Sequence, residues 1–166
     1  MAHRYTGFML IALSLLAAGS LLADSQKPAP ANGIEVPRNY KTWKLLSVSH
    51  RLDKNSIRAI LANSVAHRHT GKTSANTWPE GSVIAKLVWK DRTLAKWPDA
   101  IVPGAVSHIE FMVKDSNKYA NTGGWGFARW VGMELKPYDN DGSECFACHT
   151  KVRNSDFVFT QPAKLP

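Results

Sequence analysis

Hydrophobic and polar residues alternate over several short stretches of this chain, and a period of two is that of a β-strand. The alternation predicts strands over residues 82–90 and 108–114. Apolar and aromatic composition predicts further strands over residues 124–131 and 156–160. Residues 56–61 also favour a strand, although a run this short fits a helix as well. The pattern predicts a mainly β (α+β) chain of short strands with a few short helices.

Signals of turns and short helices lie between these stretches. Large residues spaced at three over residues 40–46 predict a short helix or turn that enters the core. Asn63 is a good N-cap for a helix over residues 64–70, and Gly71 suits the left-handed position that ends it. We also expect turns at residues 78–81 and 139–142, a helical turn from Asp115 to Tyr119, and a loop that contains Pro98 and Pro103.

The N-terminal residues have the composition of an export signal. A short basic region precedes an apolar run over residues 8–18, and small residues follow. This run is shorter than the ~20 apolar residues of a membrane-spanning helix. We therefore expect residues 1–23 to be a signal peptide, cleaved after Ser20 or Ala23, and no membrane span after cleavage.

The rest of the chain divides into a leader and one domain. Residues 24–38 are polar and rich in proline, which predicts a flexible leader. Residues 39–166 have the length of a single domain, large enough to enclose one prosthetic group.

The chain is basic, with a formal net charge of +8. A basic surface favours an acidic redox partner or a membrane surface. Nucleic acid is not expected as a partner, because the positive charges are scattered rather than clustered and because the chain is predicted to be exported.

Residues 145–149 read Cys-Phe-Ala-Cys-His, the spacing with which a haem is attached through two thioethers. Two residues between Cys145 and Cys148 let both sulfurs reach one porphyrin, and His149 then binds the iron. A zinc site needs two more close ligands, yet both cysteines of the chain are already in this motif. A thioredoxin-type dithiol belongs early in a βαβ unit, not near the C-terminus. We therefore expect one haem c, and, because bacteria attach it after export, a periplasmic location.

The second axial ligand of the iron is not evident from the sequence. Small electron-transfer cytochromes c carry the motif near the N-terminus with a methionine downstream, whereas no methionine follows it here. The alternating strands also disagree with a four-helix cytochrome c-prime. Candidates for the ligand are Met112, Met133, His50, His67, His69 and His108. No candidate is favoured, so an iron site open to small molecules is the preferred interpretation.

Several sequence segments run in order from about residue 38 to residue 160, over nearly the whole predicted domain. They are Arg-Asn-Tyr-Lys-Thr-Trp at 38–43, Ile-Arg-Ala at 57–59, Trp-Pro-Glu-Gly-Ser-Val-Ile-Ala-Lys at 78–86, Val-Lys-Asp-Ser-Asn-Lys-Tyr-Ala-Asn at 113–121, Gly-Trp-Gly-Phe at 124–127, Cys-Phe-Ala-Cys-His at 145–149 and Asp-Phe-Val-Phe-Thr at 156–160. Together these segments resemble the cytochrome P460 family, which includes the cytochromes c-prime-beta.

The resemblance implies a mostly antiparallel β fold, a homodimer, and a five-coordinate haem with His149 as the proximal ligand. In members that oxidise hydroxylamine, a lysine amine is bonded to a meso carbon of the porphyrin, and Lys86 matches its position. A distal carboxylate in those members takes protons from the substrate, and Glu110 matches it. The resemblance thus implies an oxidoreductase that converts hydroxylamine to NO or N2O and passes electrons to a small carrier such as a cytochrome c.

The residues themselves leave these roles open. Lys86 shares a predicted face with Ile84 and Val88. If that face is inward, burial disfavours the ammonium and a neutral amine is a nucleophile; if it is outward, Lys86 is simply solvated. Glu110 lies in an apolar strand and is either a base at the substrate or a carboxylate facing solvent. Arg58 interrupts an apolar segment and either binds a haem propionate or lies at the surface.

Two other functions stay open. Cytochromes c-prime-beta share the fold, lack the cross-link, and bind NO or CO in an apolar pocket lined by phenylalanine. Phe111, Phe127, Phe157 and Phe159 are candidates for such a lining. The third hypothesis is plain electron transfer, in which a side chain such as Met112 or Met133 closes the iron site.

Overall fold

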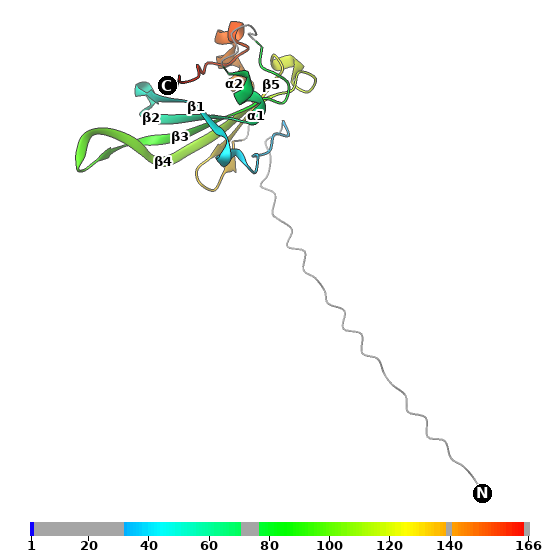
Figure 1. Ribbon diagram of the computed structural model, residues 1–166, viewed down its shortest axis with the longest axis horizontal. Helices are drawn as coiled ribbons and strands as arrows, with labels where there is room; N and C mark the ends of the chain where they lie inside the picture. The colour runs from blue at the N-terminus through cyan, green and yellow to red at the C-terminus, as the bar shows by residue number, and fades with distance from the viewer. Residues whose placement is uncertain (2–31, 71–76, 139–140, 165–166) are drawn as a thin grey trace.

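The computed structural model describes residue 1 and residues 32–70, 77–138 and 141–164. Its centre is a six-stranded antiparallel sheet whose strands follow one another in chain order (Figure 1). The strands are β1 (Lys44–Arg51), β2 (Ser56–Ala62), β3 (Val83–Leu94), β4 (Trp97–Lys114), β5 (Trp125–Val131) and β6 (Lys136–Pro137). The helices are α1 (Ser64–His69) and α2 (Ser143–His149), with short 3-10 turns η1 (Tyr40–Thr42), η2 (Leu52–Lys54), η3 (Ala120–Thr122) and η4 (Thr150–Ser155). The predicted mainly β, antiparallel fold is confirmed.

Most of the predicted elements are present. β2, β3, the second half of β4, and β5 lie where period-two alternation and composition placed strands. α1 begins after Asn63, whose side chain accepts a hydrogen bond from the backbone N–H of Ala66 at 2.9 Å. The predicted C-cap Gly71 lies outside the described residues. No helix in the described part of the chain is long and apolar enough to cross a membrane.

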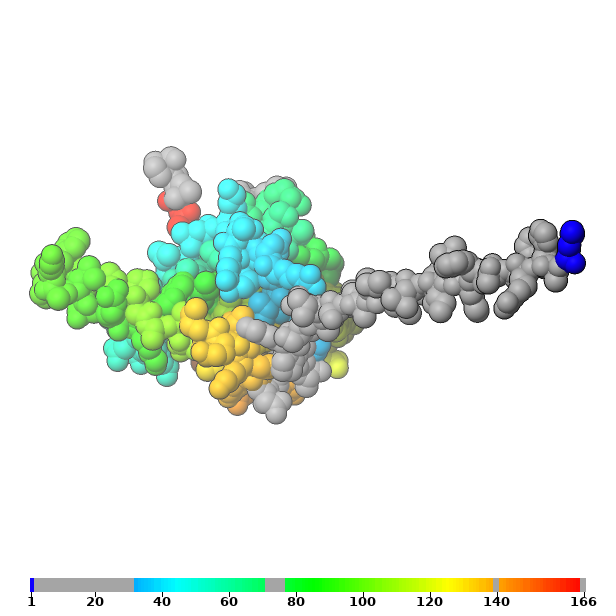
Figure 2. Space-filling model, turned by 90° about the horizontal axis from the view of Figure 1, so that it is seen from below, coloured from blue at the N-terminus to red at the C-terminus, as the bar shows by residue number. Residues whose placement is uncertain are grey.

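The loop predicted around Pro98 and Pro103 is wrong, because these residues belong to β4. β3 and β4 form one long hairpin that projects beyond the other strands (Figures 1 and 2). β5 pairs with β4 only from His108 onward. Among the described residues, no strand pairs with the other edge of the outer half of β4, so a proline without an N–H is tolerated there.

Two further local predictions are wrong. Residues 44–51 form β1, although only a short helix or turn was expected over residues 40–46; η1 supplies the turn and β1 follows it. Residues 156–160 form no strand. Asp156 and Phe157 instead have left-handed backbone angles, with φ of 48° and 63°, which no β-strand allows.

Each face of the sheet is covered by a different part of the chain. On one face, Phe111 and Trp130 pack against Ile34 and Tyr40 from the segment that precedes β1. On the other face, Phe127 and its neighbours pack against α2 and the C-terminal segment. The candidate site lies on this second face.

The N-terminal boundary of the domain differs from the prediction. Ile34 is only 4% exposed and belongs to the core, so the expectation of a flexible leader is wrong for residues 32–38. Residues 24–31, and residues 2–23 of the predicted signal peptide, lie outside the described residues.

Candidate functional site

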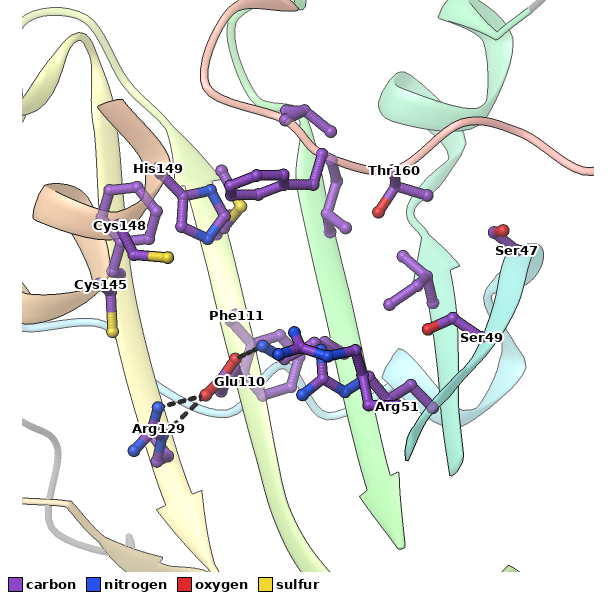
Figure 3. Close-up of a pocket in the computed structure, with 18 of the residues that line it drawn as sticks. Ser47, Ser49, Arg51, Glu110, Phe111, Arg129, Cys145, Cys148, His149 and Thr160 are labelled. Carbon is purple, nitrogen blue, oxygen red and sulfur yellow. Dashed lines mark hydrogen bonds and ion pairs between the residues drawn. The ribbon is translucent and has the colours of Figure 1, made fainter. Parts of the chain in front are cut away.

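A cavity of about 780 Å³ lies between the second face of the sheet and the segment formed by α2 and the C-terminal residues. Its size falls within the ~300–1,000 Å³ of ligand and cofactor pockets. Strands β1 to β5 line one side of it, and Cys145, Cys148 and His149 line the other (Figure 3). Lys86, Glu110 and Arg58 also line it. The six residues that the sequence analysis assigned to the haem or to proton transfer are therefore all at this cavity.

The helix α2 brings the Cys-x-x-Cys-His motif to the cavity. Positions 145, 148 and 149 are three and four residues apart, which places their side chains on one face of a helix. Gly142 fixes where α2 begins: it has φ of 85°, and a Cβ there would lie 2.7 Å from the carbonyl oxygen of Phe127. The ring of Phe146 packs against those of Phe127 and Phe157, which anchors α2 to the sheet and to the C-terminal segment.

The imidazole of His149 is oriented by one hydrogen bond. Its Nδ1 atom lies 2.6 Å from the backbone oxygen of Phe157. A carbonyl oxygen only accepts, so Nδ1 carries the hydrogen, and Nε2 of the neutral ring keeps a lone pair. Burial lowers the pKa of His149 from its ordinary value. The arrangement is that of a histidine prepared to bind a metal through Nε2.

Arg58 provides a test of whether an acidic prosthetic group fits here. Its Nε atom is buried and has no hydrogen-bond partner in the described part of the chain. Burial is also the main reason that the pKa of this guanidinium is lowered. A buried donor without a partner is unfavourable, and a haem propionate would satisfy it. The two cysteines, His149 and Arg58 thus fit a haem c.

The register of β3 and β4 brings Lys86 and Glu110 together. The two residues are direct partners across the strands, so their side chains share the face that lines the cavity. The ammonium of Lys86 forms an ion pair with Oε2 of Glu110. Both side chains are largely buried, at 27% and 14% exposed. The sequence interpretation that either residue simply faces solvent is wrong.

Glu110 has two further partners, both on its other carboxylate oxygen. Arg129, its partner across β4 and β5, donates from Nε to Oε1 at 2.7 Å, and a terminal guanidinium nitrogen lies 2.6 Å from the same oxygen. Nε2 of His108 lies 3.4 Å from Oε1. Burial raises the pKa of Glu110, but the hydrogen bond from His108 and the charges of Lys86 and Arg129 outweigh it. They hold the pKa well below its usual range, so Glu110 is a carboxylate.

The six candidates for a second iron ligand differ in whether they line the cavity. Met112 lines the cavity, whereas the other five do not. Met133 is 71% exposed, and His108 is held by Glu110 and Ser107. His50 pairs with Asp91, and His69 packs on Trp78.

The candidate phenylalanines do not gather around Glu110. The rings of Phe127 and Phe159 lie 5.0 and 5.1 Å from that of His149. Phe157 packs on Phe146. Phe111 borders the cavity, but its ring packs edge-on in the core of the opposite face, against Tyr40, Trp43 and Trp130. The side of the cavity opposite His149 therefore carries charged side chains, Glu110 and Arg129 among them, and the candidate phenylalanines do not surround these charges (Figure 3).

The sequence analysis missed Arg129, Arg51 and Lys54, which also line the cavity. Arg129 interrupts an apolar strand on the face of Phe127, and this interruption was a signal that could have identified it. Its pairing with Glu110 depends on the register of β4 and β5, which the sequence does not reveal. Arg51 and Lys54 were missed because β1 and the turn η2 were not predicted.

One of the comparisons with known proteins identifies a family. The family described as Cytochrome P460 matches residues 37–160, which is most of the chain. A search of curated proteins found no match.

Proposed function

The chain belongs to the cytochrome P460 family, and from this premise we propose that it is a periplasmic haem c protein that oxidises hydroxylamine to NO or N2O. In this proposal Cys145 and Cys148 form the two thioethers and His149 binds the iron. The bound haem would supply the iron that holds the substrate and accepts its electrons. The family match supports the haem, the predicted export signal supports the location, and the charged side chains around the cavity support the oxidation of hydroxylamine.

The observation that carries the proposal is the charged group formed by Lys86, Glu110 and Arg129 on the sheet side of the cavity. A pocket that only traps NO or CO has no use for a buried carboxylate, which is costly to desolvate unless it is paired. Oxidation of hydroxylamine, in contrast, releases protons along with electrons. A carboxylate within hydrogen-bond reach of the bound nitrogen is a suitable acceptor for them. We assign this role to Glu110.

Lys86 has a role that follows from its contact with Glu110. The resemblance to hydroxylamine-oxidising members assigns to Lys86 a covalent bond to the porphyrin. A nitrogen bonded in this way is no longer an ammonium. Oε2 of Glu110 would then lose its cation, while Arg129 continues to hold Oε1. The cross-link thus frees one carboxylate oxygen to accept protons.

The partners follow from the chemistry of the site. Oxidation needs an electron acceptor, and the basic chain favours a small acidic carrier, such as a cytochrome c. We also propose a homodimer. The projecting β3–β4 hairpin supports it, because Trp97 is 65% and Ile101 is 40% exposed there, and exposed apolar residues mark association surfaces. Sedimentation of the holoprotein measures the oligomeric state directly.

The test of the proposed function combines a spectrum with peptide mapping. The full chain is produced in a host that attaches c-type haem, and the absorption of the ferrous protein is recorded. Proteolysis and mass spectrometry then show which peptides remain bound to the porphyrin. We expect a strongly red-shifted Soret band, haem bound to the peptides of both Cys145–Cys148 and Lys86, and turnover of hydroxylamine. Lys90→Met, in the same strand as Lys86, is the matched control for Lys86→Met and should keep all three properties.

Other spectra identify the alternatives. An ordinary high-spin haem c spectrum, with no Lys86 peptide and no turnover, would indicate a cytochrome c-prime-beta that binds NO or CO. A low-spin ferric spectrum would indicate electron transfer with a sixth ligand. In that case Met112 is the residue to replace first, because its side chain lines the cavity.

A further inference from the structure

The backbone that follows the haem motif is held in an unfavourable conformation. Asp156 and Phe157 both have left-handed angles, with φ of 48° and 63°. Residues with a Cβ rarely adopt this region, and two in succession persist only where the surroundings hold them. Such a conformation at the edge of a functional site calls for an explanation of what it achieves.

The immediate result of this conformation is the position of one carbonyl group. The Phe157 oxygen lies 2.6 Å from Nδ1 of His149. The N–H of Phe157 in turn bonds to the oxygen of Val152 at 3.1 Å, and that of Asp156 bonds to Arg153 at 3.0 Å. The chain therefore turns back on the end of η4 and presents the carbonyl to the histidine.

A buried ion pair fixes this turn to the sheet. Nζ of Lys114, at the end of β4, lies 2.9 Å from each carboxylate oxygen of Asp156. The two residues are only 4% and 9% exposed. Asp156 also accepts a hydrogen bond at 2.8 Å from the backbone N–H of Trp78. A single carboxylate thus joins β4, the turn before β3 and the C-terminal segment.

The side chain of the next residue is fixed as well. The ring of Phe157 lies against Gly123, where an added Cβ would be only 2.3 Å from the ring. Gly123 itself has φ of 69°, so a larger residue is doubly disfavoured there. Asp156 is therefore held by charge and Phe157 by packing, on either side of the peptide bond between them.

We propose that Lys114 and Asp156 are positioning residues for the iron ligand: their ion pair holds the Phe157 carbonyl against His149 and thereby sets the orientation and basicity of the imidazole. This inference rests on the proposed ligation of iron by His149. A strong acceptor at Nδ1 makes Nε2 a better donor to the metal. A better donor stabilises the ferric state and lowers the reduction potential of a haem.

The test compares Lys114→Met with Lys118→Met in the haem-loaded full-length protein. Lys118 makes no ion pair with Asp156 in the described part of the chain, and its ammonium lies 5.3 Å from the ring of Tyr119, so it controls for loss of a lysine near the same turn. Two properties are measured: the iron–histidine stretching frequency of the ferrous protein and the reduction potential. We expect Lys114→Met to lower the frequency and to make the potential more positive, while Lys118→Met leaves both unchanged.

A second pair of variants keeps the test informative if Lys114→Met does not fold. Asp156→Asn removes the charge, but asparagine tolerates the left-handed region and still accepts from Trp78. Gly123→Ala displaces the Phe157 ring from the other side. Both should shift the frequency and the potential in the same direction as Lys114→Met. Wild-type values in all folded variants, even with lower thermal stability, would show that the ion pair is structural only. Absence of an iron–histidine band from the wild-type protein would instead refute the ligation by His149.

Discussion

Nδ1 of His149 and the carbonyl oxygen of Phe157 lie 2.6 Å apart, eight residues apart in the chain. This one contact decides which nitrogen of the imidazole is available to a metal. Because Nδ1 donates, Nε2 is the free nitrogen, and burial disfavours the charged ring and so lowers its pKa. The helix α2 and the turn at Asp156 therefore act together, the first by placing the ring and the second by setting its tautomer.

Removal of the imidazole should separate haem attachment from iron ligation. In His149→Gly we expect the haem to stay bound through Cys145 and Cys148, because thioethers do not depend on the axial ligand. The absorption spectrum should change, and added imidazole should restore it by entering the space of the lost ring. The matched control is His67→Gly, since His67 does not line the cavity. A His149→Gly spectrum identical to that of the wild type would exclude His149 as the ligand.

Glu110→Gln should abolish most of the turnover of hydroxylamine. Glutamine keeps the shape of the side chain but is not a base, and a general base contributes about 10²–10⁴-fold to a rate. We expect kcat to fall by at least about 10²-fold, with the haem content and ferric spectrum preserved. Glu134→Gln, at an exposed position, is the control. Unchanged turnover in Glu110→Gln would contradict its role as proton acceptor.

Arg129→Gln should change the pH dependence of the same reaction. The pKa of Glu110 is raised by burial and lowered, by a larger total effect, by His108, Lys86 and Arg129. Loss of the Arg129 charge leaves the effect of burial in place, so the pKa of Glu110 should rise. The base is active when ionised, and activity is lost as the pH falls through its pKa. The acidic limb of the pH profile of kcat/KM should therefore lie at higher pH in Arg129→Gln than in the wild type.

A matched control variant and an infrared measurement test whether the charge of Arg129 causes the change in pH dependence. Tyr138→Leu removes the ring over which the Arg129 guanidinium lies at 5.0 Å, yet keeps the charge, so its acidic limb should move less. Infrared difference spectra report protonation of the Glu110 carboxyl without turnover. An acidic limb at the same pH in Arg129→Gln and wild type would mean that Arg129 does not control this carboxyl.

The sequence identified residues that the structure brings to one cavity, but not the strand register that places them next to one another. Alternation over residues 82–90 and 108–114 placed Lys86 beside Ile84 on one face, and Glu110 beside Met112 on another. In the structure, Lys86 pairs with Glu110 and Ile84 pairs with Met112 across β3 and β4. This register places the two predicted strand faces on the same side of the sheet. Register is a non-local property, set by the hairpin turn and by side-chain packing. Arg129 was missed for this reason.

The errors also have physical causes. Two prolines predicted a loop, but no strand in the described part of the chain pairs with one side of the outer half of β4, and the missing N–H groups cost little there. The apolar residues at 157–159 predicted a strand because their composition suits one. In the structure, a buried ion pair between Asp156 and Lys114 overrides that preference. Ile34 was assigned to the leader because proline and polar neighbours concealed a single core residue.

Asn63→Ala should measure how much the side chain of Asn63, which connects the start of α1 to the sheet, contributes to the free energy of unfolding. The Asn63 side chain accepts from the N–H groups of Ala66 at 2.9 Å and Val83 at 3.2 Å, and it donates to the oxygen of Gly81 at 2.9 Å. Loss of an asparagine N-cap costs about 0.5–2 kcal/mol, and the two further bonds, to Gly81 and to Val83 at the start of β3, place this variant at the upper end. We expect the free energy of unfolding to fall by about 2 kcal/mol in denaturant titrations of the haem-loaded protein, with an unchanged spectrum. The control Asn117→Ala alters an exposed asparagine in a turn and should cost less than about 0.5 kcal/mol. Equal losses in the two variants would show that the side-chain bonds of Asn63 contribute nothing beyond those of an ordinary surface residue.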